Sequence, residues 1–556
     1  METDALTIAL TIAIAIVLAL VKFNEKEPDL HPLLLAQQSS VTPIRNEGES
    51  VIHRSKTVPH GILLTKRPSE KVKTLYDVWH TGAAVNPAGR SLMFMLQNQF
   101  AFVEHLGFNG DTEQVNTRIG GFGTGFVKAT GLKPKTDTPV GIFMPYSQES
   151  FVAQQAFYRY SFVAVPIHDL RNSDLLVEVV DQTKLKAIIV SQKVLPLLLQ
   201  SLKECPTIET IIMAGIYISP EQLELAAQYG VKLLKFAAVE YEGSWSPMEP
   251  VQPDPEDVAI INYNTRSSSL SKGVMLTHAN LIAAMTAFTE SLPAAKRFAS
   301  KDRLLSHFSN GDVISVFMSS AIILAGGSLV FPSGLMKNVL HDSQASAPTI
   351  FASTPIILEK IHEALQLTYG QGSMFKRGFA AKLALLQAGR VTTTSLWDLI
   401  GLGEVRSKLG GKVRMVVTTH PTKPETLDYI RAAMGIHVIA AHGRTETSGI
   451  ATARNMLDYT SASHLGPPVG CNEVKLVDDI AAGYTSADEP TPRGEILVRG
   501  PNVMKGYYKK PSATSTAIDG DGWFHSGELG TFHSNGTLEV LGKKKKAKSA
   551  AGSPST

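Results

Sequence analysis

The sequence predicts an α/β fold with parallel sheets. Between residues 140 and 215, short apolar and β-branched runs alternate with a segment of helical spacing, as in strands joined by crossover helices. The alternation resumes between residues 257 and 442, so we expect a second, comparable sheet. From Gly494 the runs are separated by turns, which indicates antiparallel strands. With 556 residues, 44% of them hydrophobic, the chain can bury several cores.

The predicted elements follow in chain order. In the first sheet the strands are 140–147, 162–167, 186–191 and 210–215, with a helix over 150–160. In the second sheet the strands are 257–263, 326–334, 347–354, 412–419 and 435–442. The antiparallel strands are 494–500 and 536–542.

Charge and cysteine content exclude several classes of protein. Lys and Arg number 53 against 50 Asp and Glu, a net charge of +3, so the chain lacks the basic field of a dedicated nucleic-acid binder. Cys205 and Cys471 are the only cysteines, which excludes a disulfide framework and a cysteine-based zinc site. We therefore expect no nucleic-acid partner and a reducing compartment. The sequence indicates no particular protein partner.

The N-terminal residues predict a membrane anchor. Residues 5–21 are apolar or weakly polar without interruption, at the short end of what spans a bilayer. Glu2 and Asp4 precede this run, where a cleaved signal peptide would carry positive charge. We interpret residues 1–22 as an uncleaved single-pass helix, with a buried core helix as the alternative. Lys22 and Lys26 follow it and predict that the rest of the chain faces the cytosol.

Residues 23–74 are polar and Pro-rich and predict a tether that can lie across the folded body.

The segment 262–278 reads NYNTRSSSLSKGVMLTH. It predicts a strand, a hydroxyl-rich loop, Lys272, and a helix that starts near Thr277. Such a loop can offer N–H groups, hydroxyls and one ammonium to a polyphosphate. The GxxxxGK[ST] spacing of a P-loop is absent. A serine-rich turn is also common as a plain loop, so the residues alone leave both interpretations open.

This segment resembles the signature Tyr-Thr-Ser-Gly-Thr-Thr-Gly-x-Pro-Lys-Gly-Val-x-Leu-Thr-His of the adenylate-forming (AMP-binding) superfamily. The version is closest to that of eukaryotic long-chain acyl-CoA synthetases. Further segments resemble the family's landmarks in the same order: 161–170, 395–398 (SLWD), 409–418, 442–449 (HGRTETSG), 464–478, 493–511 and 521–530.

The resemblance implies the large N-terminal domain of that superfamily over residues 75–541. Its architecture is two stacked sheets with helices and a distorted antiparallel barrel. Residues 542–556 would then be a basic remnant of the family's hinge, with the C-terminal small domain absent.

The resemblance also implies a reaction. Family members activate a long-chain fatty acid with MgATP to acyl-AMP, and coenzyme A then displaces AMP. ATP, Mg²⁺ and coenzyme A are the implied cofactors. The implied catalytic residues are Lys272, Thr445 and Glu446: Glu446 holds Mg²⁺, Thr445 hydrogen-bonds the α-phosphate, and Lys272 lines the pyrophosphate with Ser267 and Ser268.

The remaining implied residues bind the nucleotide. His442 takes the place of the Tyr that packs on adenine, and Gly443 lets the backbone pass close to the nucleotide. Glu528 stands where the family has an Asp that accepts both ribose hydroxyls, and Lys543 replaces a hinge Arg that contacts ribose.

The sequence departs from the family at demanding positions. Arg266 and Ser269 replace glycines of the phosphate loop, so the loop loses conformational freedom. The segment 418–422 (TTHPT) brings bulk to the adenine pocket, and Asp312 stands for a His near the reacting carboxylate. The family Lys of the small domain has no counterpart.

These departures leave three interpretations open. The chain is a membrane-anchored fatty acid–CoA ligase, an impaired relative that binds fatty acid or nucleotide at a membrane, or a truncated gene product. For the membrane, we predict the endoplasmic reticulum, with the lipid droplet and the peroxisome as alternatives.

Overall fold

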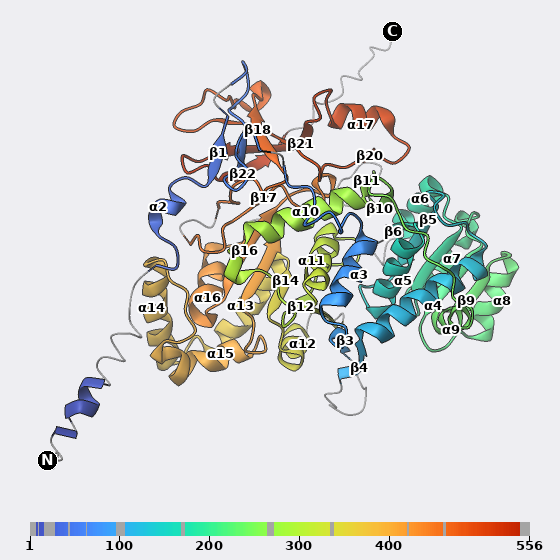
Figure 1. The fold of residues 1–556 in the computed structure, drawn as a ribbon, viewed down its shortest axis with the longest axis horizontal. Coiled ribbons are helices and arrows are strands. Elements are labelled where there is room, and N and C mark those ends of the chain that lie inside the picture. The colour runs from blue at the N-terminus through green and yellow to red at the C-terminus, as the bar shows by residue number, and fades with distance from the viewer. Residues whose placement is uncertain are drawn as a thin grey trace, which may run out of the picture.

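The computed structural model describes residues 7–8, 10–15, 28–42, 45–62, 64–95, 106–167, 173–263, 272–333, 338–419, 422–459 and 463–544. Within these ranges the chain forms two eight-stranded sheets and one six-stranded sheet, with helices between and around them (Figure 1).

The first sheet is mixed, with a parallel centre. Its parallel strands form where apolar, β-branched runs alternate with helices, because a crossover helix returns each strand in the same direction. The strands predicted over 140–215 and 257–263 are confirmed. In sheet order the strands are β20 (Gly506–Tyr507), β11 (Gly273–Thr277), β10 (Val258–Tyr263), β6 (Val163–Pro166), β5 (Pro139–Phe143), β7 (Ala187–Ser191), β8 (Thr210–Ala214) and β9 (Lys232–Lys235).

The second sheet is parallel except at its two edges. The strands predicted over 326–334, 347–354, 412–419 and 435–442 are confirmed, whereas the other four strands of this sheet were not predicted. In sheet order they are β17 (Thr452–Ala453), β16 (His437–His442), β15 (Met415–Thr419), β14 (Ile350–Ser353), β12 (Arg303–Ser306), β13 (Ser328–Phe331), β3 (Arg90–Met95) and β4 (Leu106–Asp111).

Helices fill the space between these two sheets and cover their outer faces. The largest apolar core joins both sheets through α3 (Leu75–Val85), α4 (Thr112–Thr130), α5 (Gln148–Arg159), α9 (Phe236–Ser244), α10 (His278–Ser291) and α11 (Val313–Leu324). The outer face of the first sheet is covered by α6 (Ser173–Thr183), α7 (Leu195–Gln200) and α8 (Pro220–Gln228). The second is covered by α12 (Val339–Ser346), α13 (Pro355–Tyr369), α14 (Ser373–Gln387), α15 (Gly403–Ser407) and α16 (Pro424–Met434).

The sequence placed the helices α5 and α10 correctly. The helix predicted over 150–160 is α5, which starts at Gln148. Thr277 is the N-cap residue of α10, because its hydroxyl accepts a hydrogen bond from the Asn280 N–H. The Asn280 side chain in turn accepts a hydrogen bond from the Thr277 N–H.

The third sheet is antiparallel throughout, as the short runs separated by turns after Gly494 predict. Part of the predicted tether is built into it, because β2 pairs with β18. Strands β1 and β2 have only three residues each, too few to show a strand pattern in the sequence. In sheet order the strands are β1 (Ser39–Val41), β2 (His53–Ser55), β18 (Glu473–Val477), β19 (Arg493–Arg499), β21 (Phe524–Phe532) and β22 (Leu538–Lys543). Two short helices lie near this sheet, α2 (Pro32–Leu35) and α17 (Pro511–Ala517).

Glu495 of β19 fastens the last described residues to this sheet. Its carboxylate accepts hydrogen bonds from Lys544 Nζ at 2.7 Å and from Gly527 N at 3.1 Å. Burial would raise its pKa, but hydrogen bonds from His525, Lys544 and Gly527 outweigh burial and lower the pKa from 4.5 to about 2.

Glu495→Gln should therefore reduce the acid sensitivity of the fold. A carboxyl whose pKa is lowered on folding stabilises the protein above its unfolded value of 4.5, and that stabilisation is lost as the pH falls towards about 2. We expect the wild-type urea midpoint to drop between pH 5 and pH 3 more steeply than that of the variant. Equal slopes in the two proteins would contradict this assignment.

The SLWD motif has a structural role in this fold. Asp398 accepts hydrogen bonds from the N–H and hydroxyl of Ser395 at 2.9 and 2.7 Å. Its other oxygen lies 2.6 Å from Nζ of Lys382, whose side chain is 1% exposed. The same ammonium donates to the carbonyl oxygen of Thr392 at 2.6 Å. Asp398 thus neutralises a buried cation of α14.

The predicted membrane anchor lies mostly outside the described residues. Of residues 5–21, the structure describes 7–8 and 10–15, which are helical. Among all described residues, no helix combines the length and the apolar character needed to cross a bilayer.

Candidate active site

Strand β16 delivers the segment 442–449 to a junction of the three sheets (Figure 1). The strand ends at His442, and the turn that follows contacts both other sheets. Arg444 Nη1 donates to the carbonyl oxygen of Ser526 in β21 at 2.6 Å. The N–H of Met504, which precedes β20, donates to the carbonyl oxygen of Glu446 at 2.8 Å. Residues from the segments of all three sheets therefore meet at this turn.

Gly443 is required by the packing of this turn. A Cβ atom on Gly443 would lie 2.4 Å from the backbone of Ile450, closer than any side chain tolerates. The chain doubles back at Ser448, which has a φ of 53°, and its hydroxyl donates to the carbonyl oxygen of Asn502 at 2.8 Å. The glycine thus permits a tight backbone crossing, whatever its part in nucleotide binding.

Glu446 is a buried carboxylate, 4% exposed. The Tyr507 hydroxyl donates to its Oε1 at 2.9 Å, and Arg444 Nε lies 3.4 Å from its Oε2. Burial and the neighbouring carboxylate raise the pKa of Tyr507, so the hydroxyl keeps its proton and remains a donor. Burial would lower the pKa of Arg444, but Glu446 and Glu528 together raise it. The carboxylate is thus held between a phenol and a permanent cation.

Pairing of β11 with β20 brings Lys272 to the same place. Val274 lies opposite Tyr507 in this antiparallel pair, and the Tyr508 N–H donates to the carbonyl oxygen of Gly273 at 2.7 Å. Lys272 Nζ lies 4.7 Å from the centroid of the Tyr507 ring, a cation–π distance. Tyr507 therefore links Lys272 to Glu446. The Lys272 side chain is exposed, so its ammonium is accessible to a ligand.

The predicted nucleotide residues lie beside this group. His442 Nε2 is 3.2 Å from Glu528 Oε2, and both side chains are buried. Register pairing of β21 with β22 places Glu528 opposite Lys543, which is exposed. Three residues distant in sequence, His442, Glu528 and Lys543, are thus adjacent in space.

A small pocket that is open to solvent lies among these residues. It has aliphatic and aromatic walls and a polar side, the composition typical of small-molecule sites. His442, Gly443, Arg444 and Glu528 belong to its lining. The full lining is His442, Gly443, Arg444, Thr447, Ala451, Ile496, Val498, Phe524, Ser526, Glu528 and Leu538.

Buried polar groups collect near the carboxyl ends of neighbouring strands. Both amide atoms of Asn310, the Ser353 hydroxyl and the Thr422 hydroxyl are buried and have no hydrogen-bond partner among the described residues. These residues follow or end β12, β14 and β15, whose carboxyl ends lie at the same sheet edge as that of β16. Ligands of parallel α/β sheets bind at this edge. Unpaired buried polar atoms there are consistent with a polar ligand.

Of the remaining predicted site residues, the structure describes Thr445 but not the two serines of the phosphate loop. Ser267 and Ser268 lie outside the described residues, as do Arg266 and Ser269 of the same loop. Thr445 begins a short 3₁₀ turn, Thr445–Thr447, and is half-buried next to Glu446.

Asp312 has local partners. Its carboxylate accepts hydrogen bonds from the N–H and hydroxyl of Ser309 at 2.9 and 2.8 Å. These bonds hold the acid in the turn that precedes α11, so part of its charge is satisfied there.

Sequence reasoning missed two residues of the site. Arg444 stands inside the HGRTETSG segment and Tyr507 inside the RGPNVMKGYYKKP segment, both of which carry the family resemblance. Their side chains became relevant only through contact with Glu446. Their positions inside segments that resemble the family could have marked both residues as candidates for the site.

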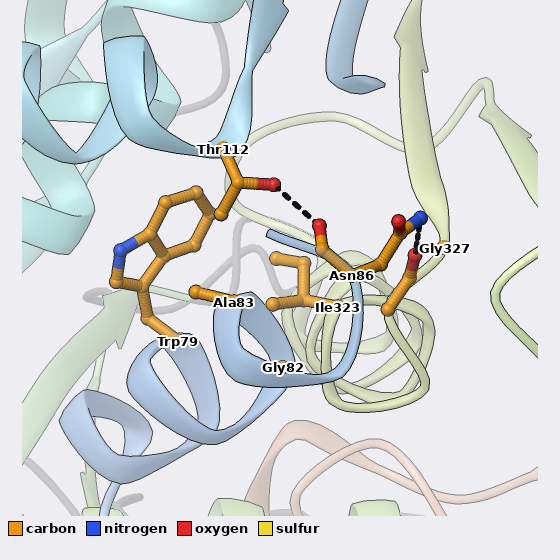
Figure 2. Close-up of a pocket in the computed structure, with 8 residues that line it drawn as sticks. Trp79, Gly82, Ala83, Asn86, Thr112, Ile323 and Gly327 are labelled. Atoms are coloured by element: carbon orange, nitrogen blue, oxygen red, sulfur yellow. Dashed lines mark hydrogen bonds between the residues drawn. The ribbon is translucent and has the colours of Figure 1, made fainter. Parts of the chain in front are cut away.

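A second pocket lies apart from this site, between α3 and α11 (Figure 2). Trp79, Gly82 and Ala83 of α3 face Ile323 across it. Asn86 closes one side, because its Nδ2 donates to the carbonyl oxygen of Gly326 at 3.2 Å, and its own carbonyl oxygen accepts from the Thr112 hydroxyl at 3.1 Å. None of the predicted site residues lines this pocket.

Comparison with known families and proteins gives consistent matches. The family model described as "AMP-binding enzyme" matches residues 111–508. The chain is similar to Long-chain-fatty-acid--CoA ligase 5 of Rattus norvegicus, at 30% identity over 85% of this chain and 68% of that protein. It is similar to Long-chain-fatty-acid--CoA ligase 6 of Homo sapiens, at 30% identity over 88% of this chain and 70% of that protein.

Solved structures share the fold at lower identity. A long-chain-fatty-acid-CoA ligase from Archaeoglobus fulgidus superposes with a TM-score of 0.66 and 17% identity, covering 88% of this chain and 87% of that one. The A domain of carboxylic acid reductase from Segniliparus rugosus, in complex with AMP and a co-purified carboxylic acid, gives a TM-score of 0.67 at 16% identity, covering 86% of this chain and 76% of that one. The architecture described above is therefore that of the adenylate-forming fold.

Proposed function

Because this chain belongs to the AMP-binding enzyme family, we propose that it activates a long-chain fatty acid with ATP and transfers the acyl group to coenzyme A. The observation that carries the proposal is the placement of Glu446, a buried carboxylate at the junction of three sheets, between Arg444 and a tyrosine that also contacts Lys272. The names of the curated relatives supply the substrate class.

The activation of a fatty acid by ATP requires positive charge around the phosphates. A fatty-acid carboxylate that attacks the α-phosphate brings an anion to a polyanion, so electrostatic stabilisation is the main requirement. Lys272 and Arg444 supply two cations, and the Thr445 hydroxyl supplies a donor next to them. Lys272 reaches the site from β11 and Arg444 from the turn after β16, so the two charges approach from different sheets.

The donor set at Glu446 fits Mg²⁺ in its chemistry. Mg²⁺ binds hard carboxylate oxygens and keeps several waters and phosphate oxygens as further ligands. Oε2 of Glu446 would serve, provided that the Arg444 guanidinium, now 3.4 Å away, gives up that oxygen. When bound, the ion would neutralise phosphate charge.

The pocket beside Glu446 suits the nucleoside. We assign His442 to the adenine, where its ring stacks with less area than the family's Tyr, and Glu528 to the ribose hydroxyls. For Glu528 to accept from ribose, its contact with His442 at 3.2 Å must loosen. Lys543 stands opposite Glu528 in the sheet and is our candidate for a further ribose contact.

Arg444→Gln should lower the Mg²⁺ concentration that half-saturates the reaction. The guanidinium competes with the metal for Glu446, and the shorter, neutral amide removes the competing charge. We expect a shift of about tenfold, which corresponds to about 1.4 kcal/mol. Titrating MgCl₂ at fixed ATP in a pyrophosphate-exchange assay measures it. An unchanged or increased Mg²⁺ requirement would mean that Arg444 serves the phosphates and not the carboxylate.

Fatty-acid-dependent exchange between ATP and labelled pyrophosphate tests the proposed function. The full-length chain, purified in detergent, is assayed with palmitate and MgATP, and a full-length curated relative serves as reference. Palmitate-dependent exchange supports the activation step, and acyl-CoA formed after addition of coenzyme A supports the whole reaction. A folded chain that binds palmitate without exchange would instead support an impaired relative that binds lipid.

For the N-terminus, we propose that residues 5–21 anchor the chain in a membrane with its bulk in the cytosol. The proposal rests on the apolar run and the lysines that follow it. Resistance of the full chain to carbonate extraction, lost on deletion of residues 1–22, is the expected result. Release of the full chain by carbonate would refute it. The endoplasmic reticulum stays our prediction for the membrane.

A further inference from the structure

Two imidazoles and a carboxylate meet at the turn between β21 and β22, among side chains for which the proposed function has no use. His533 follows β21, Glu539 lies in β22, and His464 comes from the loop before β18. One ligand atom from each side chain lies within 4.8 Å of the other two. All three side chains are half-buried, so their positions are limited by packing.

The two histidines already interact closely. His533 Nε2 is 2.7 Å from Glu539 Oε2, a hydrogen bond that aligns a ring nitrogen with a carboxylate oxygen. The His464 ring stacks on the His533 ring, with centroids 3.9 Å apart and planes at 22°. Two imidazoles and one carboxylate grouped in this way are a ligand set that metal ions bind in proteins.

Neighbouring hydrogen bonds settle which nitrogen of His464 is free to bind. The Thr537 N–H donates to Oδ1 of Asn535 at 3.2 Å, which identifies that atom as the oxygen. The Thr537 hydroxyl then donates its only proton to the same oxygen at 2.7 Å. His464 Nδ1, 3.0 Å from this hydroxyl, must therefore carry the proton and donate it. Its Nε2 keeps a lone pair, the arrangement found in metal-binding histidines.

We propose that His464, His533 and Glu539 bind a divalent transition metal, with Zn²⁺ as the best match. Two imidazole nitrogens and one carboxylate oxygen form a ligand set typical of zinc, whereas Mg²⁺ and Ca²⁺ prefer oxygen ligands alone. Metal–ligand distances of about 2.0–2.2 Å require the His464 ring to turn out of the stack. The proposal does not depend on the proposed function.

The ion would join the loop before β18 to both strands of the hairpin. Because this hairpin also carries Glu528 at its other end, the ion would fix the sheet on which the nucleotide pocket rests.

Titration of the metal-free, full-length chain with ZnCl₂ in a calorimeter tests the proposal. We expect one Zn²⁺ site. Loss of a residue that only orients a ligand weakens metal binding by about 10- to 100-fold. His464→Ala and His533→Ala each remove a ligand itself and should weaken Zn²⁺ binding by at least that factor. Thr537→Val, which keeps all three ligands but removes the orienting hydroxyl, should weaken binding about tenfold. His60→Ala, which removes a single exposed imidazole, is the matched control and should bind Zn²⁺ like the wild type.

Zn²⁺ affinity that is unchanged in the His464→Ala, His533→Ala double variant would overturn the proposal, as would a wild-type chain without a site. If a variant does not fold, the wild-type chain loaded with CoCl₂ decides the question. Strong visible absorption of four-coordinate Co²⁺, lost when Zn²⁺ is added, is expected. A weak spectrum of six-coordinate Co²⁺ would overturn the proposal.

Discussion

Glu446→Gln should reduce palmitate-dependent pyrophosphate exchange by about 10²- to 10³-fold, the usual cost of losing one preorganised electrostatic group at a reacting centre. The amide keeps the size of the side chain and can still accept the Tyr507 hydroxyl, but it has no charge for Mg²⁺. Initial exchange rates at saturating ATP measure the loss. The buried position of Glu446, 4% exposed, makes this isosteric change more informative than truncation to alanine, which would also remove the acceptor of the Tyr507 hydroxyl and leave a cavity.

Glu242→Gln is the matched control for this experiment. Glu242 is an exposed glutamate of α9 and lies outside the pocket lining, so its rate should equal that of the wild type. Thermal unfolding of both variants checks that the fold is retained. Full exchange activity in a folded Glu446→Gln protein would remove the proposed metal role from this residue.

Asp398→Ala should lower the free energy of unfolding by about 3–5 kcal/mol, the cost of leaving one member of a buried ion pair without its partner. The affected cation is Lys382, whose side chain is 1% exposed while that of Asp398 is 9% exposed. Burial already lowers the pKa of Lys382, and Asp398 is the group that counteracts this effect. Urea denaturation followed by fluorescence measures the change as a lower midpoint.

The exposed pair of Lys186 and Glu209 provides the control. Their side chains are 55% and 59% exposed at a separation of 2.9 Å, so Glu209→Ala should cost less than about 1 kcal/mol. Combining Asp398→Ala with Lys382→Met should recover part of the loss, because no buried ammonium then stays unpaired. A midpoint for Asp398→Ala no lower than that for Glu209→Ala would show that the SLWD motif has no role in stability.

The resemblance of the SLWD segment to a family landmark did not reveal this role. The motif marks a position in the family, but the partner of Asp398 lies in α14, where Lys382 is one of two lysines. A sequence does not show which lysine of a helix is turned inward, because that depends on the neighbouring η4 turn (Asp398–Leu402) and its packing.

The residue pattern was enough to predict the α/β architecture and the positions along the chain of many of the buried strands. Apolar, β-branched runs such as those at 187–191 and 437–442 form buried parallel strands because the alternation with helices leaves them no exposed face. The ordered motifs determined the family, and they led to His442, Glu446 and Glu528, which the fold brings together at one pocket or beside it.

The surroundings of these residues follow from contacts between segments that are distant in sequence. Tyr507 reaches Glu446 because β20 pairs with β11, and β1 and β2 extend the third sheet although their residues predict a tether. His464 meets His533 and Glu539 across a similarly long separation in sequence. Such contacts depend on register between distant strands and on side-chain packing, and a local pattern of residues contains neither.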